Sequence, residues 1–403
     1  MYRSVPNAGS PMPDYQILVD PPRSRWPRIL VIGVVFIVVV AVAGTAVYLV
    51  RKHTGEGRPA SGSGTKSSGT TLAKVLTVVS STPTTGAMNV APDQVVTVRL
   101  SSPVSGVSGM PMFNPPVSGS WTKVGPDSMA FRATVPFLPT STESLVLPAG
   151  TAGPHGTGGQ LLAAPVTVSF TVAQASTERL QQLLAELNYL PLSFTPSAPV
   201  KTPTETTMAQ PGTFAWRWPN TPTSLTSLWS EGYENVITKG AVMNFENQNG
   251  LAVDGLAGTR VWSALLADVG SGKMDANPYT YVFVTKQIPE SLTLFSNGTP
   301  VLFDIAVNTG APGADTTDGT YPVFEHVTSS EMKGTNPNGT TYDDPNVPWA
   351  SYFNGGDALH GFVRAQYGFP QSNGCVEMTV ANAGMLWPLT PIGTLVTVVG
   401  PAS

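Results

Sequence analysis

One short stretch near the end of the chain contains residue types that could carry out covalent chemistry. Cys375 is the single cysteine among 403 residues, and it follows directly on the turn-forming residues Ser372, Asn373 and Gly374. A thiol becomes a strong nucleophile when a base takes its proton, and His360 is the nearest candidate base in the sequence. A tight turn would let the backbone N–H groups of Gly374 and Cys375 point at one spot and bind an oxyanion there. This pattern predicts acyl transfer through a cysteine.

The same stretch resembles the signature of the L,D-transpeptidases, which have a YkuD-type catalytic domain and cross-link bacterial peptidoglycan. In that family a histidine and a small residue are followed, after a dozen or more residues, by Ser/Thr-His-Gly-Cys. Here His360 and Gly361 match the first half, and Ser372, Gly374 and Cys375 match the second. The resemblance implies that Cys375 is the nucleophile and His360 the base.

Other positions near the motif are less decided by the sequence. Asn373 stands where many members carry a second histidine, so a role of that histidine in orienting the site is in doubt here. Ser372 is expected to brace the turn. Glu377 could bind a substrate amine or be a solvated surface carboxylate, and both alternatives stay open. Gly361, Tyr342 and Trp349 are candidates for lining the substrate cleft, although a core role is as probable for the two aromatic residues.

The resemblance also implies a reaction. The Cys375 thiolate attacks the carbonyl of the third residue of a tetrapeptide stem, and D-alanine leaves. The side-chain amine of a diamino acid on a neighbouring stem then attacks the thioester, which gives a 3→3 cross-link. No cofactor or metal is needed, and carbapenem β-lactams should acylate Cys375. Two alternatives remain, an L,D-carboxypeptidase that hydrolyses the stem and a non-catalytic protein that binds the cell wall.

A catalytic domain is expected at residues 276–401, because the elements around the motif also resemble the family in their order. Short runs of β-forming residues predict strands, the turn Ser296-Asn297-Gly298 predicts a hairpin, and a helix should follow the nucleophile. A loop rich in glycine and asparagine at 330–344 lies where the family has a mobile flap over the active site. The predicted strands span 279–284, 291–295, 301–307, 320–324 and 392–399, and the predicted helix spans 379–387.

The composition favours β-rich modules over helical bundles, since charged residues are 11% of the chain while it has 40 glycines and 38 prolines. The net charge is −4, and no basic run occurs outside the flanks of the apolar segment at 29–50, which argues against nucleic-acid binding. A single cysteine excludes an intramolecular disulfide bond. The four histidines do not have metal-ligand spacing, so a zinc site is not expected.

The N-terminal part predicts a membrane anchor. Residues 29–50 lack charge and are dominated by valine, isoleucine, alanine and glycine, which suits a helix crossing a bilayer of ~30 Å. Residues 1–28 should be a disordered cytoplasmic tail, and the Gly/Ser/Thr-rich residues 51–72 a flexible linker. Basic residues flank both ends of 29–50, so the orientation follows from the substrate. A single-pass cell-membrane protein with its catalytic part on the cell-wall side is the consistent arrangement.

Two further modules are predicted between the linker and the catalytic domain. Residues 73–174 show alternating β runs separated by Pro/Gly/Asn turns and look like an Ig-like β-sandwich. Residues 175–270 resemble a small three-helix peptidoglycan-binding module with a Pro-rich insertion, with helices at 177–190, 238–246 and 259–266. These modules could bind the wall or act as spacers. The predicted fold class is therefore a multidomain, mainly β protein with an N-terminal transmembrane helix.

Overall fold

The computed structural model describes residues 75–105, 110–198 and 207–401. Across these ranges, no helix is long and apolar enough to cross a membrane. The predicted cytoplasmic tail at 1–28, transmembrane helix at 29–50 and linker at 51–72 lie outside the described residues.

The first folded region consists of two four-stranded sheets with the orders β1-β3-β6-β5 and β2-β8-β7-β4. Buried and accessible residues alternate along β3 and β7, so one face of each sheet is apolar. Phe113, Phe131, Phe137 and Phe170 meet between the sheets. This arrangement agrees with the predicted β-sandwich, while its Ig-like identity stays a prediction. The strands are β1 (Val78–Thr82), β2 (Ala87–Val90), β3 (Val96–Leu100), β4 (Met112–Phe113), β5 (Gly119–Lys123), β6 (Ser128–Ala133), β7 (Thr142–Leu147) and β8 (Val166–Val172), with a 3-10 turn η1 (Gly150–Ala152).

The next region contains the helices α2 (Thr177–Glu186), α4 (Val236–Gln248) and α5 (Thr259–Ser271). Each begins or ends on a recognisable signal: the Ser176 and Asn235 side chains cap α2 and α4, and Gly272 ends α5 at φ 70°. Helix α2 ends earlier than the predicted 190 because Asn188 adopts a left-handed conformation, φ 67°. The predicted insertion holds a hairpin of β9 (Leu192–Pro196) and β10 (Gly212–Trp216) and the short helix α3 (Thr223–Thr226). The identity of a peptidoglycan-binding module stays a prediction.

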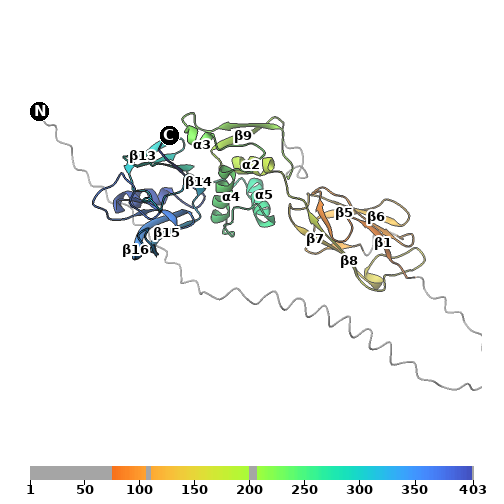
Figure 1. The fold of residues 1–403 in the computed structure, drawn as a ribbon. Coiled ribbons are helices and arrows are strands. Elements are labelled where there is room, and N and C mark those ends of the chain that lie inside the picture. Colours follow the sequence, from red (N-terminus) through yellow and green to blue (C-terminus); the bar gives the residue numbers. More distant parts are fainter. Residues whose placement is uncertain (1–74, 106–109, 199–206, 402–403) are drawn as a thin grey trace, which may run out of the picture. The chain divides into compact units, whose positions relative to one another are not determined.

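The C-terminal region packs two sheets against each other (Figure 1). The five-stranded sheet has the order β13-β12-β11-β19-β14, and the four-stranded sheet has the order β15-β16-β17-β18. Their facing sides and the helix α6 (Val380–Leu386) share one apolar core, in which Val282, Leu294, Leu359, Val376 and Met378 are buried. The strands are β11 (Thr280–Thr285), β12 (Ser291–Ser296), β13 (Thr299–Ala306), β14 (Gly319–Pro322), β15 (Glu325–Thr335), β16 (Thr341–Asn354), β17 (Asp357–Gly361), β18 (Val376–Met378) and β19 (Leu395–Val399), and η3 (Trp387–Leu389) follows α6.

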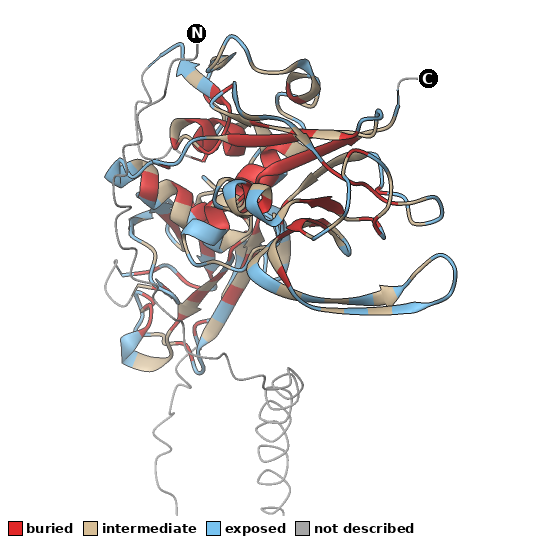
Figure 2. Ribbon diagram, turned by 90° about the vertical axis from the view of Figure 1, so that its left-hand side faces the viewer, coloured by how far each residue is buried: buried red, intermediate tan, exposed pale blue. Residues whose placement is uncertain are grey.

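The stretch predicted as a flap loop at 330–344 is mostly strand. β15 and β16 pair antiparallel as far as Thr335 and Thr341, so only residues 336–340 form the turn. Cross-strand charge supports the pairing, because Lys333 lies opposite Asp343 and its ammonium is 3.2 Å from that carboxylate. The distal parts of both strands are exposed or half-buried, while buried residues gather in the interior of the domain (Figure 2). The segment predicted as a flap is therefore a long β-hairpin rather than an irregular loop.

Candidate active site

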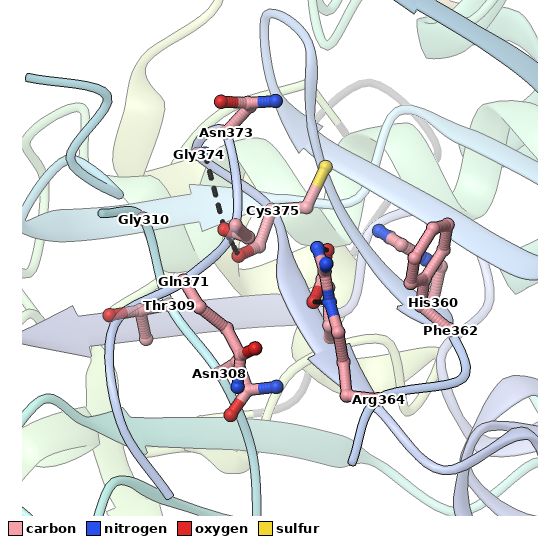
Figure 3. Close-up of polar contacts among 12 residues, drawn as sticks. Asn308, Thr309, Gly310, His360, Phe362, Arg364, Gln371, Asn373, Gly374 and Cys375 are labelled. Atoms are coloured by element: carbon pink, nitrogen blue, oxygen red, sulfur yellow. Dashed lines mark hydrogen bonds and ion pairs between the residues drawn. The ribbon is translucent and has the colours of Figure 1, made fainter. Parts of the chain in front are cut away.

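Two neighbouring parallel strands bring His360 and Cys375 together. β17 and β18 pair in the register Leu359 to Val376 and His360 to Glu377, and Cys375 directly precedes β18. Side chains alternate along a strand, so His360, Cys375 and Glu377 belong to one face of this strand pair. Figure 3 shows the thiol and the imidazole at the same end of the site. The structure thus assembles the two residues that the sequence motif singled out.

The environment of His360 fixes its tautomer. Its Nδ1 lies 3.2 Å from the Gly361 carbonyl oxygen, which can only accept, so Nδ1 carries the proton and Nε2 is left as the basic nitrogen. The side chain is 2% exposed. Burial lowers its pKa, although the Gly361 carbonyl and Glu377 act in the opposite direction. His360 is therefore held as a neutral imidazole that is ready to accept a proton.

The Cys375 thiol is also neutral at rest. Its Sγ donates to the Gly356 carbonyl at 3.6 Å. Burial raises the pKa of the thiol to about 12, with further contributions from the negative charges of Asp357 and Glu377. A resting thiolate–imidazolium pair is thus disfavoured. The arrangement instead suits general-base catalysis, in which the proton moves to His360 as the nucleophile attacks.

The turn before the nucleophile is held by one serine side chain. Ser372 Oγ donates to the Cys375 carbonyl oxygen at 2.6 Å and accepts from the Gly374 N–H at 3.2 Å. The bracing role predicted for Ser372 agrees with these contacts. The predicted use of the Gly374 N–H in an oxyanion hole does not, because Ser372 already engages that group. A contribution of the Cys375 N–H stays a prediction.

Gly374 occupies a position that only glycine fits. Its φ is +110°, and a Cβ at this position would come within 2.3 Å of Asp357 Oδ1. Asp357 is half-buried and lies opposite Gly374 at the start of β17. Burial raises the pKa of its carboxyl to about 6, against an Asn354 side chain that lowers it by hydrogen bonding. The nucleophile turn is thus packed against a titratable carboxyl.

A second layer of buried polar contacts fixes the turn from the side of the five-stranded sheet. Thr316 Oγ1 donates to the Gly374 carbonyl at 2.7 Å and accepts from the Gly310 N–H at 2.9 Å. The carboxylate of Glu290 accepts from both the N–H and the hydroxyl of Thr309, each at 2.7 Å. Isolated bridges then join this segment to the active-site strands, Asn308 to Glu377 and Gly310 to Ser372.

The hairpin turn reaches the nucleophile turn. Asn373 Nδ2 donates to Asn336 Oδ1 at 2.7 Å, and the only sequence signal for this was that Asn373 departs from the family pattern. Tyr342 of β16 lies across Gly334, and its pKa is raised by burial and by the nearby Cys375. A role of Tyr342 in lining a substrate cleft stays a prediction. The β15–β16 hairpin therefore approaches Cys375 from the side of Asn373.

Two other predicted site residues, Gly361 and Trp349, pack against neighbouring elements of the domain. Gly361 is buried, and a Cβ there would lie 3.0 Å from Val380 Cα and 3.2 Å from Ala383 Cβ, so it allows α6 to approach β17. Trp349 packs on Trp387, with ring centroids 5.6 Å apart. These two positions are explained by packing.

Glu377 is not a solvated surface residue, so that alternative was wrong. It is 4% exposed, and Arg364 binds its carboxylate with two bonds of 2.7 Å from Nε and Nη2. Sequence reasoning missed Arg364. Its spacing from His360 and Phe362 at every second residue was the available signal, because such residues share a side of an extended chain.

No group of three or more His, Cys, Asp or Glu side chains that could hold a metal ion occurs within the described ranges. The site is thus built from one cysteine, one histidine and the hydrogen-bonded groups around them. Chemically, the arrangement offers a thiol that could act as a nucleophile and an imidazole that could act as its base.

Cys375 and His360 thus lie together at the pairing of β17 with β18 in a β-rich domain. Residues 279–398 match the family model YkuD, the L,D-transpeptidase catalytic domain. This region of the chain is therefore an L,D-transpeptidase-type catalytic domain. No curated protein matches the chain.

Solved structures similar to the chain include several L,D-transpeptidases. One is from Mycobacterium smegmatis, with 13% identity, 80% of this chain and 99% of that chain covered, and a TM-score of 0.27. Another is L,D-transpeptidase 3 from Mycobacterium tuberculosis in complex with a faropenem-derived adduct, with 13% identity, 80% and 97% covered, and a TM-score of 0.28. The catalytic domain of the E. faecium L,D-transpeptidase shows 24% identity, 30% and 96% covered, and a TM-score of 0.27. At these TM-scores the assignment rests on the family model.

Proposed function

We propose that the protein is an L,D-transpeptidase that forms 3→3 cross-links in peptidoglycan through a thioester on Cys375. The observation that supports this most is the pairing of β17 with β18, which places a buried neutral His360 beside the only cysteine. The family match of residues 279–398 supplies the reaction class. The substrate of the acylation step is a peptide stem that ends in D-alanine.

In the first step Cys375 Sγ attacks the carbonyl of the third stem residue. His360 Nε2 takes the thiol proton as the C–S bond forms, and the tetrahedral intermediate carries the negative charge on its oxygen. His360 then returns this proton to the leaving nitrogen, the C–N bond breaks and D-alanine departs. The Gly361 carbonyl keeps Nδ1 protonated throughout, because it stays bound to that N–H.

In the second step the side-chain amine of a diamino acid on another stem attacks the thioester. His360 accepts the proton that the amine loses, the C–S bond breaks and the thiol recovers a proton. Water competes with the amine for the same carbonyl. The β15–β16 hairpin, tied to the nucleophile turn through Asn336 and Asn373, supports transpeptidation because a cover over the thioester limits the access of water.

The remaining parts of the chain are proposed to place this site at the cell wall. A helix at 29–50 would anchor the protein in the membrane, with the catalytic part outside. The sandwich and the helical region would hold the site at a working distance or bind the wall. Similar solved structures include an L,D-transpeptidase in complex with imipenem and an E. faecium L,D-transpeptidase catalytic domain acylated by ertapenem. We expect carbapenems to acylate Cys375 of this protein.

The test is to incubate the purified full-length chain with a disaccharide-tetrapeptide donor and to follow the products by mass spectrometry. Cys375→Ala and His360→Ala are assayed alongside. A cross-linked dimer that has lost one D-alanine, absent with both variants, would support the proposal.

Other products would change the assignment. Tripeptide without dimer would make the protein an L,D-carboxypeptidase, since water then takes the acyl group. No product and no covalent carbapenem adduct would contradict both enzymatic functions. In that case a tethered protein that binds the wall would remain.

A further inference from the structure

The Glu377–Arg364 ion pair is the one charged, mostly buried cluster at the site to which the proposed mechanism gives no role. Glu377 lies opposite His360 in the register of the two parallel strands, on the face that also bears Cys375. Its carboxylate is almost fully buried and receives both Nε and Nη2 of Arg364. A carboxylate at this depth would be strongly unfavourable without such a partner.

Arg364 is itself placed by the residues that lead away from His360. Its guanidinium carbon lies 4.6 Å from the centre of the Phe362 ring, and that ring meets the His360 ring edge to face at 6.0 Å. Figure 3 shows Arg364 beside Cys375 and His360 rather than pointing away from them. The contacts thus run from the imidazole through the phenyl ring and the guanidinium to the carboxylate of Glu377, which lies opposite His360 in the strand register.

We propose that the Glu377–Arg364 pair positions and electrostatically balances the His360–Cys375 couple. Glu377 faces the imidazole and stabilises the imidazolium that forms during acylation. Arg364 offsets the charge of Glu377, so that the carboxylate does not suppress ionisation of the neighbouring thiol. Both act through His360 and Cys375 and not by touching substrate, so they are positioning residues. The proposal rests on the proposed function only in assigning acyl transfer to this couple.

Charged and titratable groups surround His360 and Cys375 from β16, β17, β18 and the segment after β17. β17 contributes Asp357, β18 contributes Glu377, and the segment after β17 contributes Arg364 and Tyr367. β16 contributes Asp344, Tyr342 and Tyr352. Glu377 and Asp344 raise the pKa of His360 and Arg364 lowers it, while Asp357 and Glu377 raise the pKa of Cys375. Among these, Arg364 is the positive group that acts on His360, and its removal leaves only negative neighbours.

The signs of the expected effects are opposite for the two partners. Arg364→Gln leaves Glu377 uncompensated, which disfavours the thiolate and raises the pKa of Cys375. Glu377→Gln leaves Arg364 uncompensated, which favours the thiolate and lowers that pKa. The double variant removes both charges and should return the pKa close to that of the original protein. We expect single shifts of about one pH unit, the size typical of a charge at close range.

The experiment measures the rate of Cys375 alkylation by iodoacetamide as a function of pH, on the full-length chain. Since Cys375 is the single cysteine, the reaction reports on this thiol alone. Arg99→Gln, which removes a mostly exposed arginine of the sandwich, is the matched control for loss of one positive charge. Arg364→Lys keeps the charge and should leave the thiol pKa within a few tenths of a unit.

Opposite shifts in the single variants and their cancellation in the double variant would support the proposal. Shifts in the same direction, or shifts no larger than in the Arg99→Gln control, would overturn it. If Arg364→Gln does not fold, the isosteric Glu377→Gln carries the test, because a fall in the thiol pKa supports the proposal and no change contradicts it. Alkylation needs no stem peptide, so this result is separate from success or failure of the transpeptidase assay.

Discussion

The sandwich and the catalytic domain bury different kinds of side chain. Among the described residues of the sandwich the interior is apolar, and the buried polar side chains are only Ser102, Ser141 and Glu143. In the catalytic domain many polar side chains are buried around the nucleophile turn. These are Glu290, Asn308, Thr309, Thr316, His360, Ser372 and Glu377.

This difference has an energetic meaning. A buried polar group without a partner costs about 1–3 kcal/mol, whereas a fully hydrogen-bonded network costs little and fixes geometry. The network around Ser372 is hydrogen-bonded throughout, from Glu290 to Thr309 and from Thr316 to Gly374. The sandwich needs no such network, because apolar packing alone explains its interior. Of these two domains, the catalytic one therefore has the polar interior that can hold atoms in place for chemistry.

The largest effect on turnover is expected from the base. His360→Gln should lower the rate of acylation by about 10²–10⁴-fold, because no other group takes the thiol proton. Stopped-flow measurement of carbapenem acylation gives this rate directly. Melting temperatures measured in parallel control for folding, and a loss of less than fivefold in a folded variant would argue against His360 as the base.

The next effect concerns a buried carboxyl that touches neither Cys375 nor His360. Glu290→Ala leaves the N–H and the hydroxyl of Thr309 without their partner, so the bridge from Gly310 to Ser372 should shift. Turnover should fall by up to about 10²-fold, because small displacements of reacting groups can lower a rate by this factor. Glu290→Gln keeps one acceptor oxygen and should recover part of the activity. Equal activities of the two variants would show that the network does not position the turn.

A smaller effect is expected from the contact between hairpin and turn. Asn336→Ala removes the acceptor for Asn373 and should raise the ratio of hydrolysed to cross-linked product several-fold, because water reaches the thioester more easily. Thr340→Val is the matched control, since it removes the other side-chain contact of Asn336 and leaves Asn373 untouched. The product ratio is read by mass spectrometry. If the ratio is unchanged in both variants, the contact between hairpin and turn does not limit the access of water to the thioester.

The pH dependence of stability offers a further comparison. The pKa of Asp357 is raised to about 6 in the folded protein from 3.8, so the folded state holds the proton more tightly than the unfolded one. Stability contributed by the protonated form is then lost as pH rises from about 4 to about 6. The melting temperature of Asp357→Asn should therefore fall less than that of the original protein as the pH rises over this range. If the melting temperatures of both proteins change equally between pH 4 and 7, the raised pKa of Asp357 is contradicted.

The smallest effect on turnover is expected from a large-to-small substitution in the core of the sandwich. Phe131 is 4% exposed and contacts Phe113 and Trp121, so Phe131→Ala should destabilise the sandwich by about 3–5 kcal/mol. Carbapenem acylation of Cys375 should be unchanged. Chemical denaturation followed by tryptophan fluorescence measures the first expectation, and a loss of acylation rate would show that the two regions are not independent.

Local patterns were sufficient to predict part of the catalytic domain. The strands near Thr280, Ser291 and Leu395 follow from β-forming runs, and the Asn297-Gly298 turn specifies the hairpin of β12 and β13. The motif around Cys375 also indicated His360, because the spacing between them is that of a known family, and the structure brings the two together at neighbouring strands. These features depend on residues that are close in sequence or on a spacing that is already known.

The contacts that organise the site could not be predicted in this way. Arg364 pairs with Glu377 and Glu290 pairs with Thr309 over sequence separations of 13 and 19 residues, so no local period reveals these contacts. The 330–344 segment looked like a loop because its glycines and asparagines favour turns, yet cross-strand pairing extends it into a hairpin. The oxyanion role given to Gly374 failed for a similar reason, since the N–H is engaged by a serine side chain.

The central claim is that Cys375 carries the acyl group. The most direct measurement is rapid-quench mass spectrometry of the full-length chain mixed with a tetrapeptide-stem donor, followed by peptide mapping. We expect a transient adduct equal in mass to the donor minus D-alanine, on the peptide that contains Cys375, and none in Cys375→Ala. Cross-linked product formed without that adduct, or an adduct on another residue, would contradict it.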